Sequence, residues 1–473
     1  MTTLVVVASS LLLALMIGVV ELGRGRIRGG IDFLRAATGI YFTCFAVAPV
    51  YLQFADLVPI RSGSWIWMLR TPFNDPVFAY ASLLGLVGYA VMLGGYWLVR
   101  PRGLRPEPTS RLVSSGYLWV SSCGLAAVGT MALVVYAKSV GGFAFFLAEG
   151  LSFRGDNPPV VSRWAFLSNV APLVIGGMLM SFALRQYYTS GARRRAATLL
   201  CVGLYAASLA ILFHQAGRAA FVAFLITLPL IGVVQQGNLR IRHVLLGIAV
   251  FAALILFGKS FFALARDPGV FLQGGLRGIE VTGAIRAIVW EFSFPIVTLA
   301  NVIRSVPSEL GVRWFYDIPL ALAYLVPQRL TGIIHEPTIT MVNTALFGLQ
   351  GGIPVDLLSF GYYSMVLPGA LATAAVMGAL LGCGERLFPA SPDPLRAGLR
   401  VSWILLLGFR IMYADPQLFW RLGLNLVIMT GVVGLPGLFR SLFPGTGPIH
   451  GQVRPGLPFL QPQFPEDGEG TQQ

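Results

Sequence analysis

Apolar runs of about twenty residues recur along the whole chain, and this repetition constrains the fold more than any other feature. A helix of that length crosses the roughly 30 Å hydrocarbon core of a bilayer with its backbone hydrogen bonds satisfied internally. Only 11% of the residues are charged and 56% are hydrophobic, whereas soluble domains carry roughly a quarter charged residues. The sequence therefore predicts an all-α polytopic membrane protein without a soluble catalytic domain of ordinary size.

We expect about eleven membrane-spanning helices, of which about eight lie within residues 1–262 and three within 353–440. The first run lacks the positive leader and cleavage site of a signal peptide, so we expect a retained helix. The predicted spans are residues 1–20, 33–53, 77–99, 113–137, 165–184, 196–213, 219–235, 244–262, 358–382, 401–414 and 419–439.

The arginines predict which connections face the cytoplasm. More than half of them lie in six segments, which are 21–35, 100–111, 185–195, 240–242, 386–400 and the tail from Arg440. The positive-inside rule places such segments in the cytoplasm, so the N-terminus is expected outside and the C-terminus inside. The tail 441–473 is rich in Pro and Gly and lacks apolar periodicity, which predicts a disordered cytoplasmic extension.

The long segment 263–352 falls on the outer face by the same rule, and we expect a large loop with interfacial helices there. Its stretch Ala284–Ile303 is apolar enough to span, but it contains Arg286, Glu291 and Pro295. If this stretch were a span, every later loop would lie on the opposite side of the membrane from the side that the positive-inside rule predicts. We therefore expect an interfacial or re-entrant helix.

Four groups of charged residues face outward in this topology. They are the loop Leu147–Trp164 with Arg154 and Arg163, the turn His214–Arg218, the large loop with Arg329 and His335, and the pair Lys259 and Arg266 at the entrance to that loop. An arginine at a helix end is usually an anchor that reaches lipid headgroups, and this ordinary role outweighs a catalytic one by roughly two to one. Arg218 is the exception, because the turn HQAGR is so short that its side chain is expected to point into the bundle.

Two residues are candidates for a general base. His335 is followed by Glu336, and a carboxylate can orient an imidazole and raise its basicity. Glu291 is the second candidate, although it could equally pair with Arg286. His214 is more typical of a satisfied interfacial histidine.

The sequence contains no metal-ligand cluster: there is no DxD pair, no HExxH motif and no clustered His or Cys at ligand spacing. The four cysteines lie within or at the ends of predicted spans, which disfavours disulfides and thiolate metal sites. We therefore expect no metal and no cofactor. Guanidinium groups, which stay charged and bind phosphate oxygens in pairs, would neutralise any diphosphate on the outer face. The net charge of +14 reflects topology in this distribution and does not indicate a nucleic-acid partner.

Three stretches resemble the oligosaccharide repeat unit polymerase (Wzy-type O-antigen polymerase) family. They are GGFAFFLAEGLSFRGDNP at 141–158, HQAGRAAFVAFL at 214–225 and PQRLTGIIHEPTITMVNTALFGLQGGIPVDLLSFGYYSMVLPGALA at 327–372. The Gly-Arg turn after a helix, the Thr-Asn run around Asn343 and the Gly-Gly-Ile-Pro entry to the next span are the most telling parts. The resemblance covers about three fifths of the chain.

The resemblance implies a GT-C-like glycosyltransferase of the bacterial inner membrane with its active site facing the periplasm. It would transfer a glycan chain from undecaprenyl diphosphate to the sugar hydroxyl of a second lipid-linked repeat unit, for O-antigen or exopolysaccharide synthesis. The bilayer is then a partner, and a chain-length regulator and a flippase are candidate protein partners.

The same resemblance suggests roles for individual residues. Arg154, Arg218 and Arg329 would stabilise the departing diphosphate, and His335 or Glu291 would accept the proton of the attacking hydroxyl. Further substrate-binding residues are expected to be Arg163, Lys259, Arg266, Arg286 and Asn343.

Two other functions stay open. An O-antigen ligase would pass the same donor to lipid A core and would share the fold and the arginine chemistry. A glycolipid flippase or exporter would not be an enzyme, and it would carry charges at mid-span depth along a pathway. Arg410, inside the predicted span 401–414, is the main residue that favours the exporter.

The absence of a ligand cluster from the sequence predicts a metal-independent reaction. Purified protein supplied with a lipid-linked repeat unit should make polymer in excess EDTA. Activity that disappears with EDTA and returns with magnesium would contradict this prediction.

Overall fold

A computed structural model describes residues 1–24, 30–54, 73–100, 113–148, 160, 162–215, 218–237, 247, 249, 281–326, 336–347 and 352–442. Of these, residues 148, 218, 219, 281–290 and 435–442 are described as helical backbone alone. The chain divides into two compact units, Met1–Val433 and Gly434–Gln473, and the second contributes only the end of one helix to the described residues.

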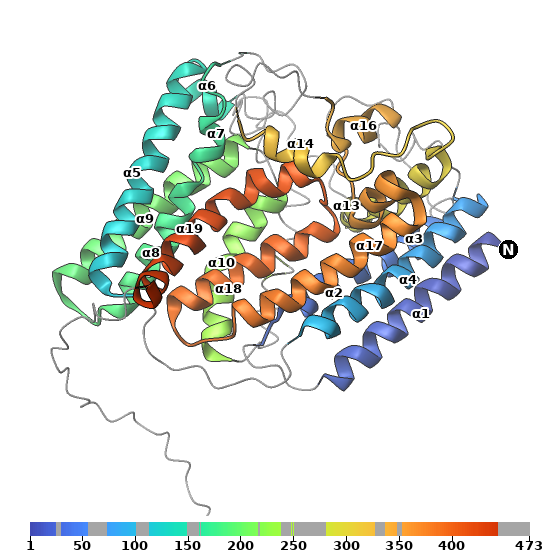
Figure 1. Cartoon of the computed structure of the whole chain (residues 1–473), viewed down its shortest axis with the longest axis horizontal. Helices are drawn as coiled ribbons and strands as arrows, with labels where there is room; N and C mark the ends of the chain where they lie inside the picture. The colour runs from blue at the N-terminus through green and yellow to red at the C-terminus, as the bar shows by residue number, and fades with distance from the viewer. Residues whose placement is uncertain are drawn as a thin grey trace, which may run out of the picture. The chain divides into compact units, whose positions relative to one another are not determined.

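Every regular element in these ranges is helical (Figure 1). The first half contains α1 (Thr2–Gly23), α2 (Phe33–Phe42), a π-helical turn (Thr43–Val47), α3 (Ala48–Gln53), α4 (Pro76–Val99), α5 (Ser115–Ser139), α6 (Phe143–Ala148), α7 (Leu167–Val170), α8 (Leu173–Tyr187), α9 (Gly191–His214) and α10 (Arg218–Gln236). The second half contains α13 (Val281–Ser305), α14 (Asp317–Ala323), α16 (Ile339–Leu346), α17 (Leu357–Leu387), α18 (Pro394–Gly408), a 3-10 turn η5 (Phe409–Ile411) and α19 (Pro416–Leu442).

Eight described segments are long and apolar enough to cross a bilayer, which confirms the multi-pass membrane class. They are Thr2–Gly23, Phe33–Gln53, Pro76–Val99, Ser115–Ser139, Leu167–Tyr187, Gly191–His214, Leu357–Leu387 and Pro416–Gly434. The predicted span 219–235 corresponds to a shorter apolar helix, Ala220–Gln236, and 401–414 corresponds to α18 with η5. The predicted span 244–262 lies almost wholly outside the described residues.

α18 begins seven residues before the predicted start at 401. Asp393 caps it, accepting the backbone N–H groups of Leu395 (3.1 Å) and Arg396 (2.9 Å). Pro394 occupies the first helical position, where its missing N–H costs nothing. The Asp-Pro pair therefore marks the start of this helix. The predicted start at 401 came too late because it was taken from the apolar run alone.

Contacts between segments far apart in sequence define two ends of the bundle. At one end, Glu385 accepts the N–H of Phe33 (2.7 Å), and the hydroxyl of Tyr187 donates to Asp393 (2.5 Å). These residues belong to or adjoin segments that the arginines predict to be cytoplasmic, so we call this the inner end. At the other, outer end, the N–H of Ala414 donates to the carbonyl of Val355 (2.7 Å). The contacts thus bring three of the predicted cytoplasmic segments, 21–35, 185–195 and 386–400, to the same end of the bundle.

The described side chains form two hydrophobic cores. One contains residues of the helices α1 through α4 together with α13, α16 and α17. The other contains residues of α5, α8, α9 and α10 together with α18 and α19. α18 links them, because it packs on α2 from the first group and on α8 and α10 from the second (Figure 1).

α4 and α17 approach so closely that their backbones touch. A Cβ atom at Gly378 would lie 1.9 Å from the carbonyl oxygen of Met92, and one at Gly95 would lie 2.1 Å from that of Ala375. Only glycine fits at such a contact, and close approach through small residues is a common way to pack helices in membranes.

α13 includes the stretch 284–303, for which we expected an interfacial or re-entrant helix. Its part from Glu291 onward packs on α3, α4, the π-helical turn and α17. Ile296, Val297, Leu299 and Ala300 are fully buried. This burial is unlike that of an amphipathic helix on the lipid surface, so the described part of α13 belongs to the interior of the bundle.

α17 contains the predicted span 358–382, but it is broken. Met365 and Val366 leave the helical conformation, and Val366 has φ +54°, which is strained for a β-branched residue. A Cβ atom at Gly361 would lie 2.3 Å from the carbonyl oxygen of Gly369. Farther from the break, the hydroxyl of Thr373 donates to the carbonyl of Leu357 (3.1 Å). Residues 357–364 therefore run back antiparallel to the rest of α17 as a short helical hairpin.

The α4–α17 contact predicts a strong dependence on glycine. Gly378→Leu should destabilise the fold by about 3 kcal/mol or more, because backbone blocks the new side chain. Gly431→Leu is the matched control, since a Cβ atom there meets nothing within 4 Å. Thermal unfolding in detergent measures both variants, and equal stability of the two would contradict the described packing.

Candidate functional site

The start of α19 is held by Asp415 at the outer end. Its carboxylate accepts hydrogen bonds from the N–H of Gln417 (2.8 Å) and from the hydroxyl of Thr340 in α16 (2.5 Å). Burial raises the pKa of the Asp415 carboxyl, and the hydrogen bonds that it accepts oppose this rise. Together with the bond from Ala414 to Val355, these contacts fix where α19 enters the bundle.

Arg410 is buried where α18 ends in η5, with 7% of its surface exposed. Its Nε donates to the carbonyl of Leu406 (3.3 Å), and the guanidinium lies 5.9 Å from the centre of the Phe419 ring. Among the described residues, one terminal nitrogen has no hydrogen-bond partner, although Asp415 is close enough to act on the charge. Arg410 therefore lies at a helix end, where it supports the start of α19.

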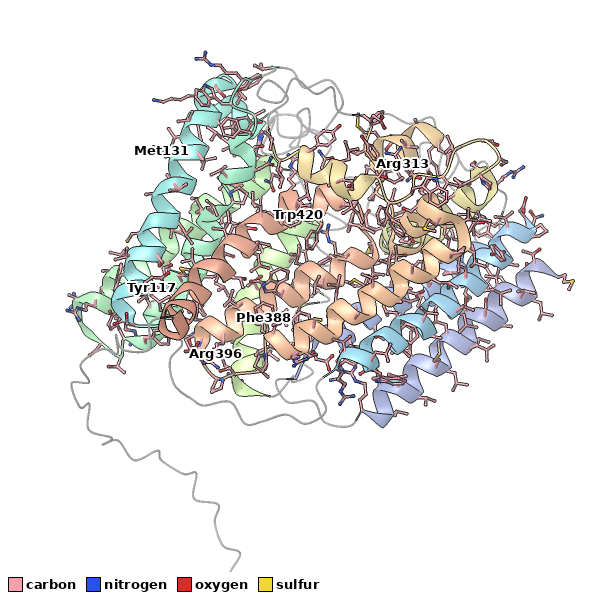
Figure 2. The ribbon with its side chains drawn as sticks, in the orientation of Figure 1. Tyr117, Met131, Arg313, Phe388, Arg396 and Trp420 are labelled. Atoms are coloured by element: carbon pink, nitrogen blue, oxygen red, sulfur yellow. The ribbon has the colours of Figure 1, made fainter. Side chains whose placement is uncertain are left out.

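Arg421 lies in the second turn of α19, beside Trp420, which Figure 2 labels. Its side chain is exposed. Its charge acts on Tyr136 of α5 and His214 of α9. Among the described residues, no hydrogen bond or ion pair to Arg421 occurs.

His214, the last residue of α9, is held by contacts from two other helices, α5 and α6. Its Nδ1 lies 2.6 Å from the carbonyl oxygen of Phe146 in α6, and because a carbonyl only accepts, Nδ1 carries the proton. The imidazole stacks on the Phe146 ring with centroids 3.7 Å apart, and the Tyr136 ring approaches edge-on at 5.6 Å. The HQAGR turn that leads to Arg218 therefore starts from a fixed point near Arg421.

Three arginines at the inner end have carboxylate partners, whereas Arg421 has none among the described residues. Arg24 pairs with both Glu21 and Asp32, and Arg35 pairs with Glu21 at 2.8 Å. Arg400 is 1% exposed and pairs with Glu385 at 2.9 Å, which closes the bundle across α17 and α18. A cation within a membrane-spanning helix is costly, so such a residue is a candidate for a functional site.

The structure describes only part of the predicted site. Residues Arg154, Lys259, Arg266, Arg329 and His335 lie outside the described residues. Arg218 is the first residue of α10 and Arg286 lies in α13, but neither side chain is described.

Glu291 and Arg163 are described, and they lie in different surroundings. Glu291 is half-buried in α13, one turn before Phe294, whose ring centre is 5.6 Å from that of Tyr413 near Arg410. Arg163 is exposed beside the outer end of α5, with its guanidinium 5.7 Å from the centre of the Trp164 ring. Glu291 therefore approaches the α18–α19 connection, whereas Arg163 lies at the surface.

Asn343, predicted to bind substrate, is fully buried in α16. Its amide nitrogen donates to the carbonyls of Ile353 (3.1 Å) and Pro354 (3.4 Å), and its oxygen accepts the hydroxyl of Tyr363 (3.1 Å). These bonds engage both ends of the amide. The geometry favours a structural role, in which Asn343 joins α16 to the hairpin of α17.

Sequence reasoning missed Arg421 and Asp415. Arg421 was visible as the single charge early in the apolar run 419–439, and a charge inside such a run is a site hypothesis by default. Asp415 precedes Pro416, which is the same helix-start signal that Asp393 and Pro394 give in α18.

The candidate site is thus the exposed guanidinium of Arg421 near Tyr136 of α5 and His214 of α9, and it has no hydrogen-bond or ion-pair partner among the described residues. In the described ranges, no group of three or more His, Cys, Asp or Glu side chains is placed to hold a metal ion. Comparisons with protein-family models, with curated proteins and with solved structures gave no match.

Proposed function

We propose that the chain is a glycosyltransferase that polymerises lipid-linked oligosaccharide repeat units on the outer face of the bacterial inner membrane. The single observation that carries this proposal is the exposed guanidinium of Arg421 within a membrane-spanning helix, which has no ion-pair partner among the described residues. A guanidinium is suited to a strongly charged oxygen anion such as a diphosphate. The donor, a glycan on undecaprenyl diphosphate, follows from the family resemblance of the sequence.

In the proposed reaction, a sugar hydroxyl of the acceptor repeat unit attacks the anomeric carbon of the donor glycan. The carbon–oxygen bond to the diphosphate breaks, and undecaprenyl diphosphate leaves with the bonding electron pair. Arg421 and, across the HQAGR turn, Arg218 stabilise the negative charge on the leaving group. The hydroxyl proton passes to a base, for which His335 and Glu291 are the candidates.

The positions of the charges favour an outward site over an export pathway. Arg410, which in the sequence favoured an exporter, lies in η5 at the end of α18. Arg421 lies in the second turn of α19, near the same outer end. A charged pathway would continue through the depth of the bundle, whereas the inner-end arginines 24, 35 and 400 are paired with carboxylates.

A glycan gel from a deletion strain tests the proposed function. Loss of a polymerase should collapse the ladder of repeat units to a single attached repeat. Loss of every attached repeat would instead indicate a ligase acting on lipid A core. Accumulation of lipid-linked repeats on the cytoplasmic face would indicate an exporter.

Arg421→Gln should reduce polymerisation by about a hundredfold or more, because removing one charge-stabilising donor commonly costs that much. Arg421→Lys should also lose most activity, since lysine keeps the charge but not the paired donors of guanidinium. Arg386→Lys, at the exposed inner end of α17, is the matched control and should retain activity.

Initial rates on purified lipid-linked donor and acceptor measure these three variants, with folded yield checked by size-exclusion chromatography. A well-folded Arg421→Lys variant at the wild-type rate would refute the assignment of Arg421 as a diphosphate-binding residue.

A further inference from the structure

An arginine-lined cavity lies at the inner end, at the turn between α8 and α9. α9 has 24 residues, so this turn is about 35 Å along the helix from His214. The cavity has a volume of about 470 Å³ and is lined by Arg185, Gln186, Tyr188, Thr189 and Arg194. It is therefore separate from the candidate site at Arg421.

Contacts from other helices fix the walls of this cavity. The indole N–H of Trp119 in α5 donates to the hydroxyl of Tyr188 (3.2 Å). The amide of Gln235 at the end of α10 donates to the side-chain oxygen of Gln186 (2.9 Å) and to the carbonyl of Pro392 (3.2 Å). The cavity is thus an open hollow lined by the α8–α9 turn, and contacts from α5 and α10 hold two of its lining residues, Tyr188 and Gln186, in place.

The cavity carries positive charge without a lining carboxylate. Arg185 ends α8, and Arg194 is flanked in the first turn of α9 by Arg193 and Arg195, all of them exposed. None of these four arginines forms an ion pair among the described residues. Asp393, which reaches this region, accepts the hydroxyl of Tyr187 and caps α18. Three cations among the first five residues of a helix also oppose its dipole, so a bound anion would relieve an unfavourable arrangement.

The surroundings indicate that the anion is part of a lipid. Leu199 and Val202 follow on the same face of α9 as Arg195, and they are 74% and 61% exposed. Trp119 and Tyr188 beside the cavity are the aromatic types that gather at a membrane interface. Guanidinium groups would hold a headgroup phosphate while acyl chains cover these apolar side chains.

We propose that this cavity is a binding site for the phosphate headgroup of an anionic phospholipid in the cytoplasmic leaflet. Basic pockets between helices on this side of a membrane protein suit such headgroups. The site is independent of the proposed transfer reaction, since none of its lining residues adjoins the outer end.

The test measures binding of short-chain phosphatidylglycerol to the purified full chain in detergent. Arg185→Gln/Arg194→Gln should weaken binding about tenfold, because it removes both lining cations. Arg100→Gln/Arg386→Gln removes the same charge from exposed inner-end positions outside the cavity lining, and it should bind as the wild type does.

Two further probes distinguish the source of the phosphate. Short-chain phosphatidylcholine should bind more weakly than phosphatidylglycerol, and inorganic phosphate should not displace phosphatidylglycerol at equal concentration. Arg185→Lys/Arg194→Lys should recover part of the affinity, which separates lost charge from a folding defect. Equal binding by the Gln variant and the wild type would overturn the site, and displacement by equimolar inorganic phosphate would overturn the lipid assignment.

Discussion

The backbone contact between Gly361 and Gly369 is the interaction on which the outer end of the bundle depends. It allows the first eight residues of α17 to double back against the rest of the helix. The returning segment then bonds to the loop before α14, because the N–H of Arg313 donates to the carbonyl of Tyr363 (2.9 Å). Tyr363 also donates to Asn343, which ties α16 to the same hairpin.

The hairpin determines where α19 enters the bundle, and so where Arg421 lies. Val355, immediately before the hairpin, accepts the N–H of Ala414, and Thr340 of α16 donates to Asp415. Residues 314, 315 and 366 adopt positive φ without being glycine, and strain of this kind persists only where surrounding contacts enforce it. These contacts therefore hold the outer end in place near Arg421, whereas ion pairs such as Arg400 with Glu385 join helices at the inner end.

The sequence was sufficient to predict the membrane class and the grouping of the helix ends. Runs such as 77–99 satisfy the length and apolarity of a span, and these properties do not depend on tertiary contacts. The hairpin in α17 could not be predicted in the same way, because GYYSMVLPG is apolar throughout and Pro368 is as compatible with a kink as with a reversal. Only the contact of Gly361 with Gly369 decides between these alternatives.

The candidate site was predicted less well than the fold. Arg218 and Glu291 were identified from local pattern alone, and the hydrogen bonds that engage Asn343 come from residues 10 to 20 positions away. Arg421 was overlooked because an arginine near the end of a span is ordinarily an anchor for headgroups. Its position beside Tyr136 and His214 is a property of three helices packed together, which no single stretch of sequence contains.

The central claim is that Arg421 and His214 lie toward the outer face of the membrane. Arg163 and Ser190 test it directly, because both are exposed and one candidate span, Leu167–Tyr187, separates them. In intact spheroplasts, an impermeant thiol reagent should label Arg163→Cys and should reach Ser190→Cys only after the membrane is permeabilised. Labelling of Ser190→Cys alone in intact spheroplasts would place the site in the cytoplasm and contradict the account.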